Sequence, residues 1–366
     1  MTNQTRKREI DGLRGLAILL VVLFHFYVRW SSVVPYGDRY ADSLLFKHGG
    51  LGVQLFFMIS GYVIFMTLDT SVGFLQFLRK RWTRLFPAML LTSLLIFATA
   101  PLLPERPAGQ PQIIDLLPGL VFVEARWLHG IFHVDIQDLE GVFWSLYAEV
   151  RFYLLVAALY FFAGRSRTVP VLIGLALFFS LLQFAGDVAA VPSHPLIKVV
   201  VSIVGEVLVG RHMAWFLIGI LTYLNSRGRA TKWARAQAVL VVALALSGLQ
   251  KGAEGAVVAA LVICLFLLVA WHGKLTRFFS GRPFIFFGMV SYPLYLMHEN
   301  AGVAIIIKAG HVEWIPFAML PVLALVLLAI PAYLMARYIE PRLQRLLSPR
   351  KIESQRLEPV GGQIVL

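Results

Sequence analysis

Two ionisable side chains stand in an otherwise apolar stretch near the start of the sequence, DGLRGLAILLVVLFHF. In a helix, Arg14 and His25 would be separated by three whole turns plus about 20°, with a rise of about 16 Å, so they would share one face. A titratable group inside a membrane span is costly, and a functional role is the first hypothesis for it. The structural alternative is that Arg14 extends to the membrane surface and His25 hydrogen-bonds a neighbouring helix.

A carboxylate and a second histidine are expected at the depth of His25. Glu149, in FWSLYAEVRFYLL, falls about two turns below the outer end of its span. Ser291, Tyr295 and His298, in SYPLYLMHE, occupy positions i, i+4 and i+7 on one stripe of a later span. A carboxylate beside a histidine suits general-base catalysis, because Glu149 can orient the His25 imidazole and stabilise it after it takes a proton from a hydroxyl.

A pair of arginines supplies a candidate phosphate site at the opposite end of the spans. Arg81 and Arg84, in RKRWTRLFP, lie one turn apart at the mouth of the third span, near Arg14 by topology. The alternative is an ordinary cluster of positive charge at the cytoplasmic surface. An anionic ligand that presents a reactive group about 16 Å deeper would fit this outline. Coenzyme A carrying an acyl thioester fits, and a nucleotide sugar or a polyprenyl phosphate would also satisfy the phosphate end.

Composition indicates the environment of these residues. The chain has 366 residues, of which 58% are hydrophobic and 14% are charged, more apolar surface than one soluble core could cover. Apolar runs approach the roughly 20 residues that a membrane-spanning helix needs. The net charge of +13 is not massed in one soluble region, so nucleic-acid binding is not indicated. The single cysteine, Cys264, excludes an intrachain disulfide and a cysteine-based metal cluster.

The fold class that these runs predict is an all-α, polytopic helical membrane bundle with about ten spans. The bulky FHFYVRW after the first run does not resemble a signal cleavage site, so we expect this run to be retained as the first helix. Glu206, Arg211 and His212 interrupt one segment, which could be a broken or re-entrant helix. The predicted spans are 12–30, 51–68, 86–103, 142–163, 168–187, 196–225, 234–250, 255–272, 284–307 and 315–337.

The distribution of charge predicts the orientation. Lys and Arg are concentrated at the N-terminus, in every second connection and in the tail, so these parts, and therefore both termini, are expected in the cytoplasm. We expect residues 1–345 to form one membrane domain and residues 346–366 a basic, disordered cytoplasmic tail. The segment RYIEPRLQRLLSPRK is expected to form a helix that is solvated or touches phospholipid.

Several motifs, taken together, resemble the acyltransferase-3 family of integral membrane acyltransferases, and the resemblance covers most of the chain. The family's arginine, ten residues, histidine signature corresponds to Arg14 and His25. The other four motifs appear in the family's order as GVQLFFMISGYVIF with Ser60 and Gly61, RWTRLFP, WSLYAEVRFY with Trp144, Ser145, Glu149, Phe152 and Tyr153, and SYPLYLMH. Two positions depart from the family pattern: Gln54 stands where an aspartate is common, and Val150-Arg151 replaces a common Glu-Gln pair. Arg151 cannot share the helix face of Glu149 and is expected to contact another neighbour.

The resemblance implies a multi-pass protein of a bacterial cytoplasmic (inner) membrane that takes an acyl group, usually acetyl, from acyl-CoA. The implied acceptor is a hydroxyl of a lipid-linked or cell-surface carbohydrate, such as lipopolysaccharide or exopolysaccharide. On this hypothesis His25 is the base, Glu149 its partner, and Arg14, Arg81 and Arg84 hold the CoA phosphates. Supporting residues are Ser60, Trp144, Ser145, Tyr153, Ser291, Tyr295 and His298. Many members carry a fused esterase-like domain outside the membrane, which we do not expect in this chain.

Other interpretations stay open at this stage. A secondary transporter could use the same buried His and Glu residues to relay protons or bind a solute. The acceptor could instead be a lipid, a peptidoglycan sugar or a small metabolite, and transfer could be direct or pass through a covalent acyl-enzyme. Trp144 could anchor the chain at the interface as well as stack on a sugar. His48, His129, His133 and His311 show no ligand spacing, and we predict no metal.

Overall fold

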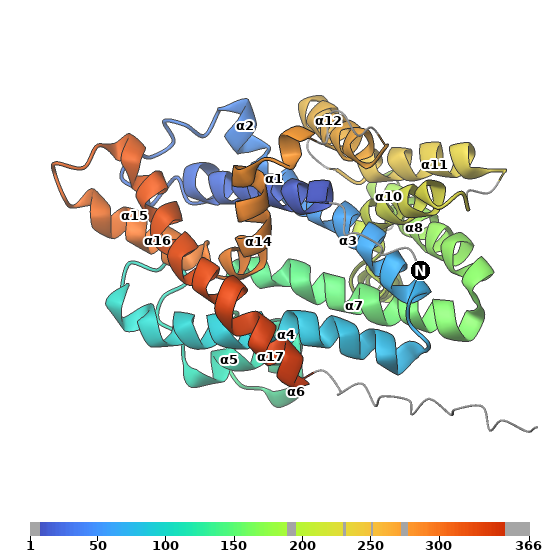
Figure 1. Ribbon diagram of the computed structural model, residues 1–366, viewed down its shortest axis with the longest axis horizontal. Coiled ribbons are helices and arrows are strands. Elements are labelled where there is room, and N and C mark those ends of the chain that lie inside the picture. Colours follow the sequence, from blue (N-terminus) through green and yellow to red (C-terminus); the bar gives the residue numbers. More distant parts are fainter. Residues whose placement is uncertain (1–7, 189–194, 230–231, 250–251, 272–276, 348–366) are drawn as a thin grey trace, which may run out of the picture.

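The computed structural model describes residues 8–188, 195–229, 232–249, 252–271 and 277–347, and all regular structure in these ranges is helical (Figure 1). The helices are α1 (Arg8–Phe24), α2 (Leu44–Lys47), α3 (Gly52–Asp69), α4 (Phe74–Thr99), α5 (Leu116–Val121), α6 (Ala125–Phe132), α7 (Trp144–Ala158), α8 (Arg165–Val188), α9 (Pro195–Ser202), α10 (Gly210–Ser226), α11 (Ala234–Ser247), α12 (Gly252–Trp271), α14 (Arg282–Met297), α15 (Asn300–Gly310), α16 (Leu320–Leu334) and α17 (Glu340–Leu347).

Eight helical segments of the described chain are long and apolar enough to cross a membrane, which confirms the predicted polytopic helical membrane fold. They are Arg8–Arg29, Gly49–Asp69, Phe74–Leu102, Gly141–Ala163, Arg165–Phe184, Val199–Ser226, Gly252–Trp271 and Phe317–Leu347. The other two predicted spans are also helical, but shorter. Segment 234–250 contains the 14-residue α11, and segment 284–307 is divided into α14 and α15 at His298 and Glu299.

The break expected within residues 196–225 is present. α9 ends at Ser202, a π-helical turn follows, and Val209 has a left-handed φ of 58° before α10 begins. The Glu206 carboxylate in this turn accepts hydrogen bonds from the Arg126 guanidinium of α6. The charged residue that interrupts the apolar pattern therefore ties the break to the long 104–141 connection.

Glycines let two helix pairs approach closely at the centre of the bundle. On α1 and α14, Gly15 and Gly288 face the partner helix so tightly that an added Cβ would overlap its backbone. On α3 and α10, Gly61 and Gly219 have the same relationship. Small residues at crossings are the usual means of close helix packing in membranes. Because α1 and α14 pack in this way, the end of α1 with His25 lies beside the end of α14 with His298.

One end of the bundle is marked by an ion-paired carboxylate. Asp69, at the end of α3, lies 2.9 Å from Arg165 of α8 and 2.5 Å from Arg229, and the hydroxyls of Tyr160 and Tyr223 also donate to it. We call this the Asp69 end; it lies at the right in Figure 1, where α3 ends and α4 and α8 begin. That this end faces the cytoplasm stays a prediction from the charge distribution.

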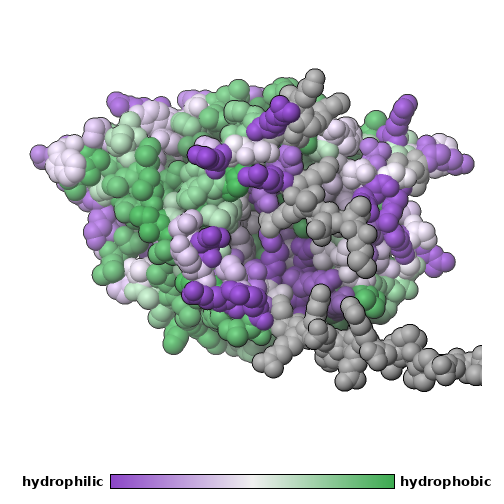
Figure 2. Space-filling model, in the orientation of Figure 1, coloured by the Kyte–Doolittle hydropathy of each residue, from purple (hydrophilic) through white to green (hydrophobic). Residues whose placement is uncertain are grey.

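The surface is divided between apolar and polar side chains. Figure 2 shows hydrophobic surface over the left and lower parts of one face and hydrophilic residues towards its centre and right.

The predicted helix in the C-terminal segment is present as α17, and the backbone oxygen of Leu347, its last residue, accepts a hydrogen bond from Arg79 of α4. Of the predicted tail, residues 346–366, the first two belong to α17, and residues 348–366 lie outside the described residues.

Candidate active site

A cavity of about 70 Å³ lies among α1, α3, α4, α7 and α14. It brings together eight of the twelve residues that the sequence proposes as site residues, drawn from all five motifs. Its lining is Arg14, Val53, Phe56, Phe57, Ser60, Arg84, Leu85, Ser145, Leu146, Glu149, Tyr153, Ser291, Tyr292 and Tyr295. The five motifs therefore converge on one site although they are spread over almost 300 residues of chain.

Glu149 is the carboxylate of this cavity. Its Oε1 accepts a hydrogen bond of 2.5 Å from the Ser60 hydroxyl of α3 and one of 2.7 Å from the Tyr153 hydroxyl, one turn further along α7. Two hydroxyl groups from different elements therefore donate to one oxygen of this side chain. This pairing also gives Ser60 and Tyr153 a defined role, which is to hold the Glu149 side chain in place.

The three arginines proposed as phosphate ligands divide into two groups. Arg14 and Arg84 line the cavity, and both are partly exposed. Arg81 is buried instead, with 6% of its surface exposed, and its guanidinium donates to the Thr67 hydroxyl and to the Val63 carbonyl oxygen of α3. Arg81 thus fastens α4 to α3, and it lies outside the cavity lining.

Tyr295 connects the cavity to His298. Its hydroxyl lies 2.7 Å from the Ser145 Oγ, and its ring centroid lies 5.6 Å from that of His298. Ser291, one turn earlier on α14, donates to the Gly288 carbonyl oxygen of its own helix. Trp144 is 39% exposed and packs edge-on against Phe57, which suits the surface anchoring left open by the sequence.

His25 and His298 form a directly bonded pair just beyond Tyr295. His25 opens a π-helical turn at the end of α1, a feature common at functional sites. Its Nδ1 lies 2.8 Å from the Val21 carbonyl oxygen and 3.2 Å from the His298 Nε2, while the His298 Nδ1 lies 2.8 Å from the Tyr295 carbonyl oxygen. A carbonyl oxygen can only accept, so both Nδ1 atoms carry hydrogen. The Nε2 atom of neutral His25 is then an unprotonated acceptor, as a general base requires.

The carboxylate beside His25 is Glu299. Its Oε1 lies 3.7 Å from the His25 Nε2 and also accepts a hydrogen bond of 3.3 Å from the Trp30 indole. The interpretation of Glu149 as the partner of His25 therefore does not match the geometry, in which Glu149 is bonded to Ser60 and Tyr153. The reason is that the chain turns at Glu299, between α14 and α15, and this turn directs the carboxylate back towards α1.

A second buried carboxylate supports this turn. Glu140 Oε2 accepts a 2.7 Å hydrogen bond from the Asn300 backbone N–H, and its other oxygen lies 3.5 Å from the Arg106 guanidinium. Burial raises the pKa of Glu140 to about 8, with Arg106 opposing the shift and the Glu299 charge adding to it. The 104–141 connection is in this way attached to the residue that follows Glu299.

Sequence reasoning missed Glu299, Glu140 and Arg106 as parts of the site. Glu299 was detectable, because it is an acidic residue within an apolar run and directly follows His298. Glu140 and Arg106 lie in a connection outside the spans, where charged residues are ordinary, so nothing in their local sequence singles them out. One further expectation is confirmed: Arg151 contacts a different neighbour, donating to Glu124 at 2.8 Å.

Comparison with known proteins identifies the family of the chain. A profile of the acyltransferase-3 family, described as an acyltransferase domain, matches residues 7–336. The chain is 28% identical over 163 residues to the peptidoglycan O-acetyltransferase OatA of Listeria monocytogenes and 30% identical over 169 residues to the O-acetyltransferase OatA of Staphylococcus aureus. Each match covers 40% of this chain and 23% of the relative, so the chain matches about a quarter of their length.

No solved structure gives a significant match to the chain. The family match, by contrast, includes every residue of the cavity lining and of the histidine pair, from Arg14 to Glu299. The chain therefore belongs to the acyltransferase-3 family of membrane acyltransferases.

Proposed function

We propose that this protein transfers an acyl group, most simply acetyl, from acyl-CoA to a hydroxyl of a carbohydrate at the cell surface or on a lipid carrier. The observation that carries the proposal is the geometry of His25, whose Nε2 is unprotonated in the neutral ring and lies 3.7 Å from a buried carboxylate. Such a group can take a proton from a hydroxyl and keep the resulting positive charge stabilised. The acetyltransferase names of the OatA relatives support acetyl as the group and a peptidoglycan-type sugar as one acceptor.

In the proposed reaction, the acceptor hydroxyl gives its proton to the His25 Nε2 as its oxygen attacks the thioester carbonyl. The tetrahedral intermediate collapses, the carbon–sulfur bond breaks, and the proton passes from His25 to the leaving CoA sulfur. Glu299 stabilises the imidazolium between these two steps, and His298 accepts the hydrogen bond that keeps the other ring nitrogen protonated. No covalent acyl-enzyme is needed in this scheme.

The donor is proposed to enter through the cavity. Arg84 and Arg14 are the lining cations, and guanidinium groups suit the phosphates of coenzyme A. The 70 Å³ cavity is smaller than an acyl-pantetheine arm. Tyr295 is part of its lining and also contacts His298. We propose that the arm displaces Tyr295 from Ser145 to bring the thioester to His25.

The cellular location of the protein is proposed from its fold. The multi-pass helical architecture requires a membrane, and we propose the bacterial cytoplasmic membrane, with the Asp69 end towards the cytoplasm, where acyl-CoA is made.

The test is an acyl-transfer assay on the purified full chain in lipid nanodiscs. Radiolabelled acetyl-CoA is supplied with a muropeptide or a lipid-linked glycan, and the acceptor is analysed for alkali-labile acetate. We expect acetylated acceptor with the native chain and none with His25→Ala that elutes and melts like the native protein. Solute flux in sealed vesicles without CoA release would overturn the proposal in favour of a transporter. Labelled protein after incubation with acetyl-CoA alone would replace the direct scheme by a covalent one.

A further inference from the structure

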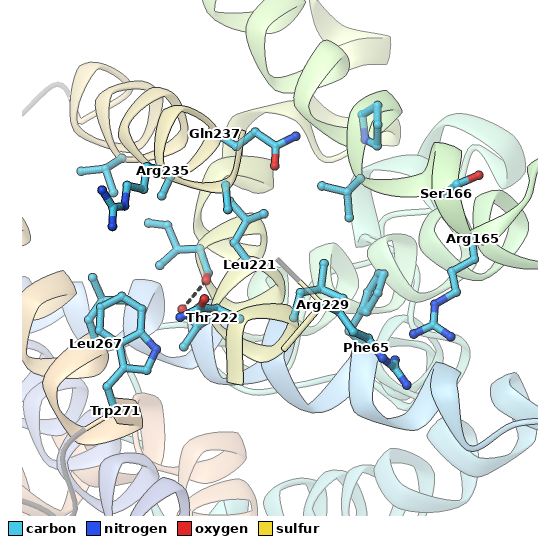
Figure 3. Close-up of a pocket in the computed structure, with 18 residues that line it drawn as sticks. Phe65, Arg165, Ser166, Leu221, Thr222, Arg229, Arg235, Gln237, Leu267 and Trp271 are labelled. Carbon is cyan, nitrogen blue, oxygen red and sulfur yellow. Dashed lines mark hydrogen bonds between the residues drawn. The ribbon is translucent and has the colours of Figure 1, made fainter. Parts of the chain in front are cut away.

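A second cavity, larger than that of the active site, lies apart from it in the described chain. Its volume is about 880 Å³, within the range of small-molecule binding sites. Five helices line it: Phe65 from α3, the start of α8, the second half of α10, the first half of α11 and the end of α12 (Figure 3). It shares no lining residue with the cavity that holds Glu149.

The wall of this cavity is largely apolar, and Ser166, Asn225 and Gln237 add polar side chains to the lining. Figure 3 shows Leu221 of α10 at its centre, with Leu267 and Trp271 of α12 to one side. The polar side chain in this part of the wall, Thr222, donates its hydroxyl to the Ile218 carbonyl oxygen of its own helix and so presents a satisfied group. Protein interiors contain few voids larger than a water molecule, so a hollow of this size requires an occupant. An apolar wall favours a hydrocarbon chain over water.

The mouth of the cavity is cationic. Arg165, Arg229 and Arg235 line it, at the start of α8, after the end of α10 and in the first turn of α11. These positions all belong to the Asp69 end. Asp69 pairs with Arg165 and Arg229, so one carboxylate faces two guanidiniums. Arg235 forms no ion pair with the described residues, and the mouth therefore keeps an excess of about two positive charges.

The position of the cavity relative to the membrane points to an occupant from the bilayer. α8, α10 and α12 belong to membrane-spanning segments, whereas α11 has only 14 residues, fewer than the roughly 20 that a complete crossing needs. The outer face of α11 is apolar, with 71% of Val239 exposed. Ile218 lies eight residues before the end of α10, about 12 Å from the mouth along the helix. The cavity thus extends from a charged surface into the apolar interior of the membrane. A lipid has the same arrangement, with a charged headgroup and hydrocarbon chains.

From these observations we propose that this cavity is a binding site for an anionic membrane lipid. The phosphate lies at Arg235, and one hydrocarbon chain follows Leu221 and Val242 between α10 and α11. Arginine forms paired hydrogen bonds to phosphate oxygens, which suits Arg235, the lining arginine that lies across the cavity from the Asp69 ion pairs (Figure 3). The lipid completes the packing of α11 against the bundle. This site is independent of the proposed acyl transfer.

The experiment is lipid binding to the purified full chain, measured by native mass spectrometry after exchange into detergent with added phosphatidylglycerol. We expect one tightly retained phosphatidylglycerol and at least tenfold weaker retention of zwitterionic phosphatidylcholine. Arg235→Gln should weaken phosphatidylglycerol retention about tenfold, because a hydrogen bond to a charged group contributes about 1.5–3 kcal/mol. Arg167→Gln is the matched control, since Arg167 is exposed in the same part of the bundle but does not line the cavity.

A second pair of variants tests the hydrocarbon part. Ala238→Trp, on the cavity side of α11, should displace the lipid, while Ala236→Trp, on the same helix but outside the lining, should not. Equal lipid retention in all four variants would overturn the proposal. So would displacement of the lipid by acetyl-CoA at concentrations that saturate transfer, because the cavity would then belong to the donor. Acyl transfer itself is not the readout, so a failure here is distinguishable from a failure of the proposed function.

Discussion

The Nδ1 of His25 lies 3.2 Å from the Nε2 of His298, so the two rings are bonded directly across the α1–α14 contact. Each ring also has its Nδ1 directed at a backbone carbonyl oxygen, of Val21 and Tyr295 respectively. The backbone of two helices thereby determines the tautomer of both histidines. We propose that His298, as a second acceptor for the Nδ1 hydrogen of His25, helps to keep the Nε2 of His25 available.

Replacement of His298 tests this orienting role. We expect His298→Phe to lower kcat for acyl transfer about 100-fold, the size typical of a lost acid–base contribution, with little change in the KM for acyl-CoA. His298→Gln should recover part of the rate, because a glutamine oxygen can accept the His25 hydrogen bond. Steady-state kinetics on nanodisc-embedded protein measures both constants. If the Phe and Gln variants were equally impaired, His298 would act through packing instead.

Glu299 and Glu149 are expected to separate in kinetic behaviour, because they contact different groups. Glu299→Gln removes the negative charge 3.7 Å from the His25 Nε2 and should lower kcat by 10²–10³-fold. Glu149→Gln removes the charged acceptor of Ser60 and Tyr153 inside the cavity and should change the KM for acyl-CoA more than kcat.

The comparison is made on variants whose melting temperatures match the native chain. A large kcat defect in Glu149→Gln together with a native kcat in Glu299→Gln would restore Glu149 as the partner of His25.

The arginines of α4 provide a matched series for donor binding. Arg84 lines the cavity and forms no ion pair with the described residues, so Arg84→Gln should raise the KM for acyl-CoA about tenfold or more at nearly unchanged kcat. Arg81→Gln should instead lower the melting temperature, because it removes the buried contacts to Thr67 and Val63. Arg79→Gln, on the exposed side of the same helix, is the control, because it removes a positive charge and the contact to Leu347 but no residue of the cavity lining. Equal KM values for all three variants and the native chain would place the CoA phosphates elsewhere.

How far the sequence predicted this site depended on whether a residue type is unusual in its setting. Arg14, His25 and Glu149 stand out because charged groups are rare in apolar runs, and the structure places them at or next to one site. The pairing of carboxylates with histidines was not accessible in the same way. Depth along each helix puts residues in a common plane, but only the rotation of the helices and the turn at Glu299 decide which side chains meet.

The same limit applies to the fold. Hydropathy located all ten predicted helical segments and the break within 196–225, because apolar length and interrupting charges are local properties. The glycine contacts of α1 with α14 and of α3 with α10 join residues far apart in sequence. Gly219 has no local feature that distinguishes it from Gly174, although their surroundings differ completely.

Those two glycines make a direct test of the packing. A methyl group at Gly219 would overlap the Met58 carbonyl oxygen of α3, whereas one at Gly174 of α8 meets nothing within 4 Å. Gly219→Ala should therefore lower the melting temperature by several degrees, since overpacking costs about 1–3 kcal/mol. Gly174→Ala should be neutral or slightly stabilising, because alanine favours the helix by up to about 1 kcal/mol over glycine. If both variants melted alike in the same detergent, the α3–α10 contact would be looser than the structure shows.

The buried Glu140 predicts how stability depends on pH. Burial raises its pKa from 4.5 to about 8, so the folded protein binds this proton more tightly than the unfolded chain does. The resulting stabilisation is complete below about pH 4.5 and is lost as the pH rises through 8, because folding then requires a buried, charged carboxylate. Glu140→Gln keeps the acceptor for the Asn300 N–H but cannot ionise, so its melting temperature should fall less between pH 6 and pH 9 than that of the native chain. Glu313→Gln, at an exposed position, controls for the general effect of removing one acidic group. A native and a Glu140→Gln curve that stay parallel over this range would mean that Glu140 is already ionised at pH 6 and that the Arg106 ion pair outweighs its burial.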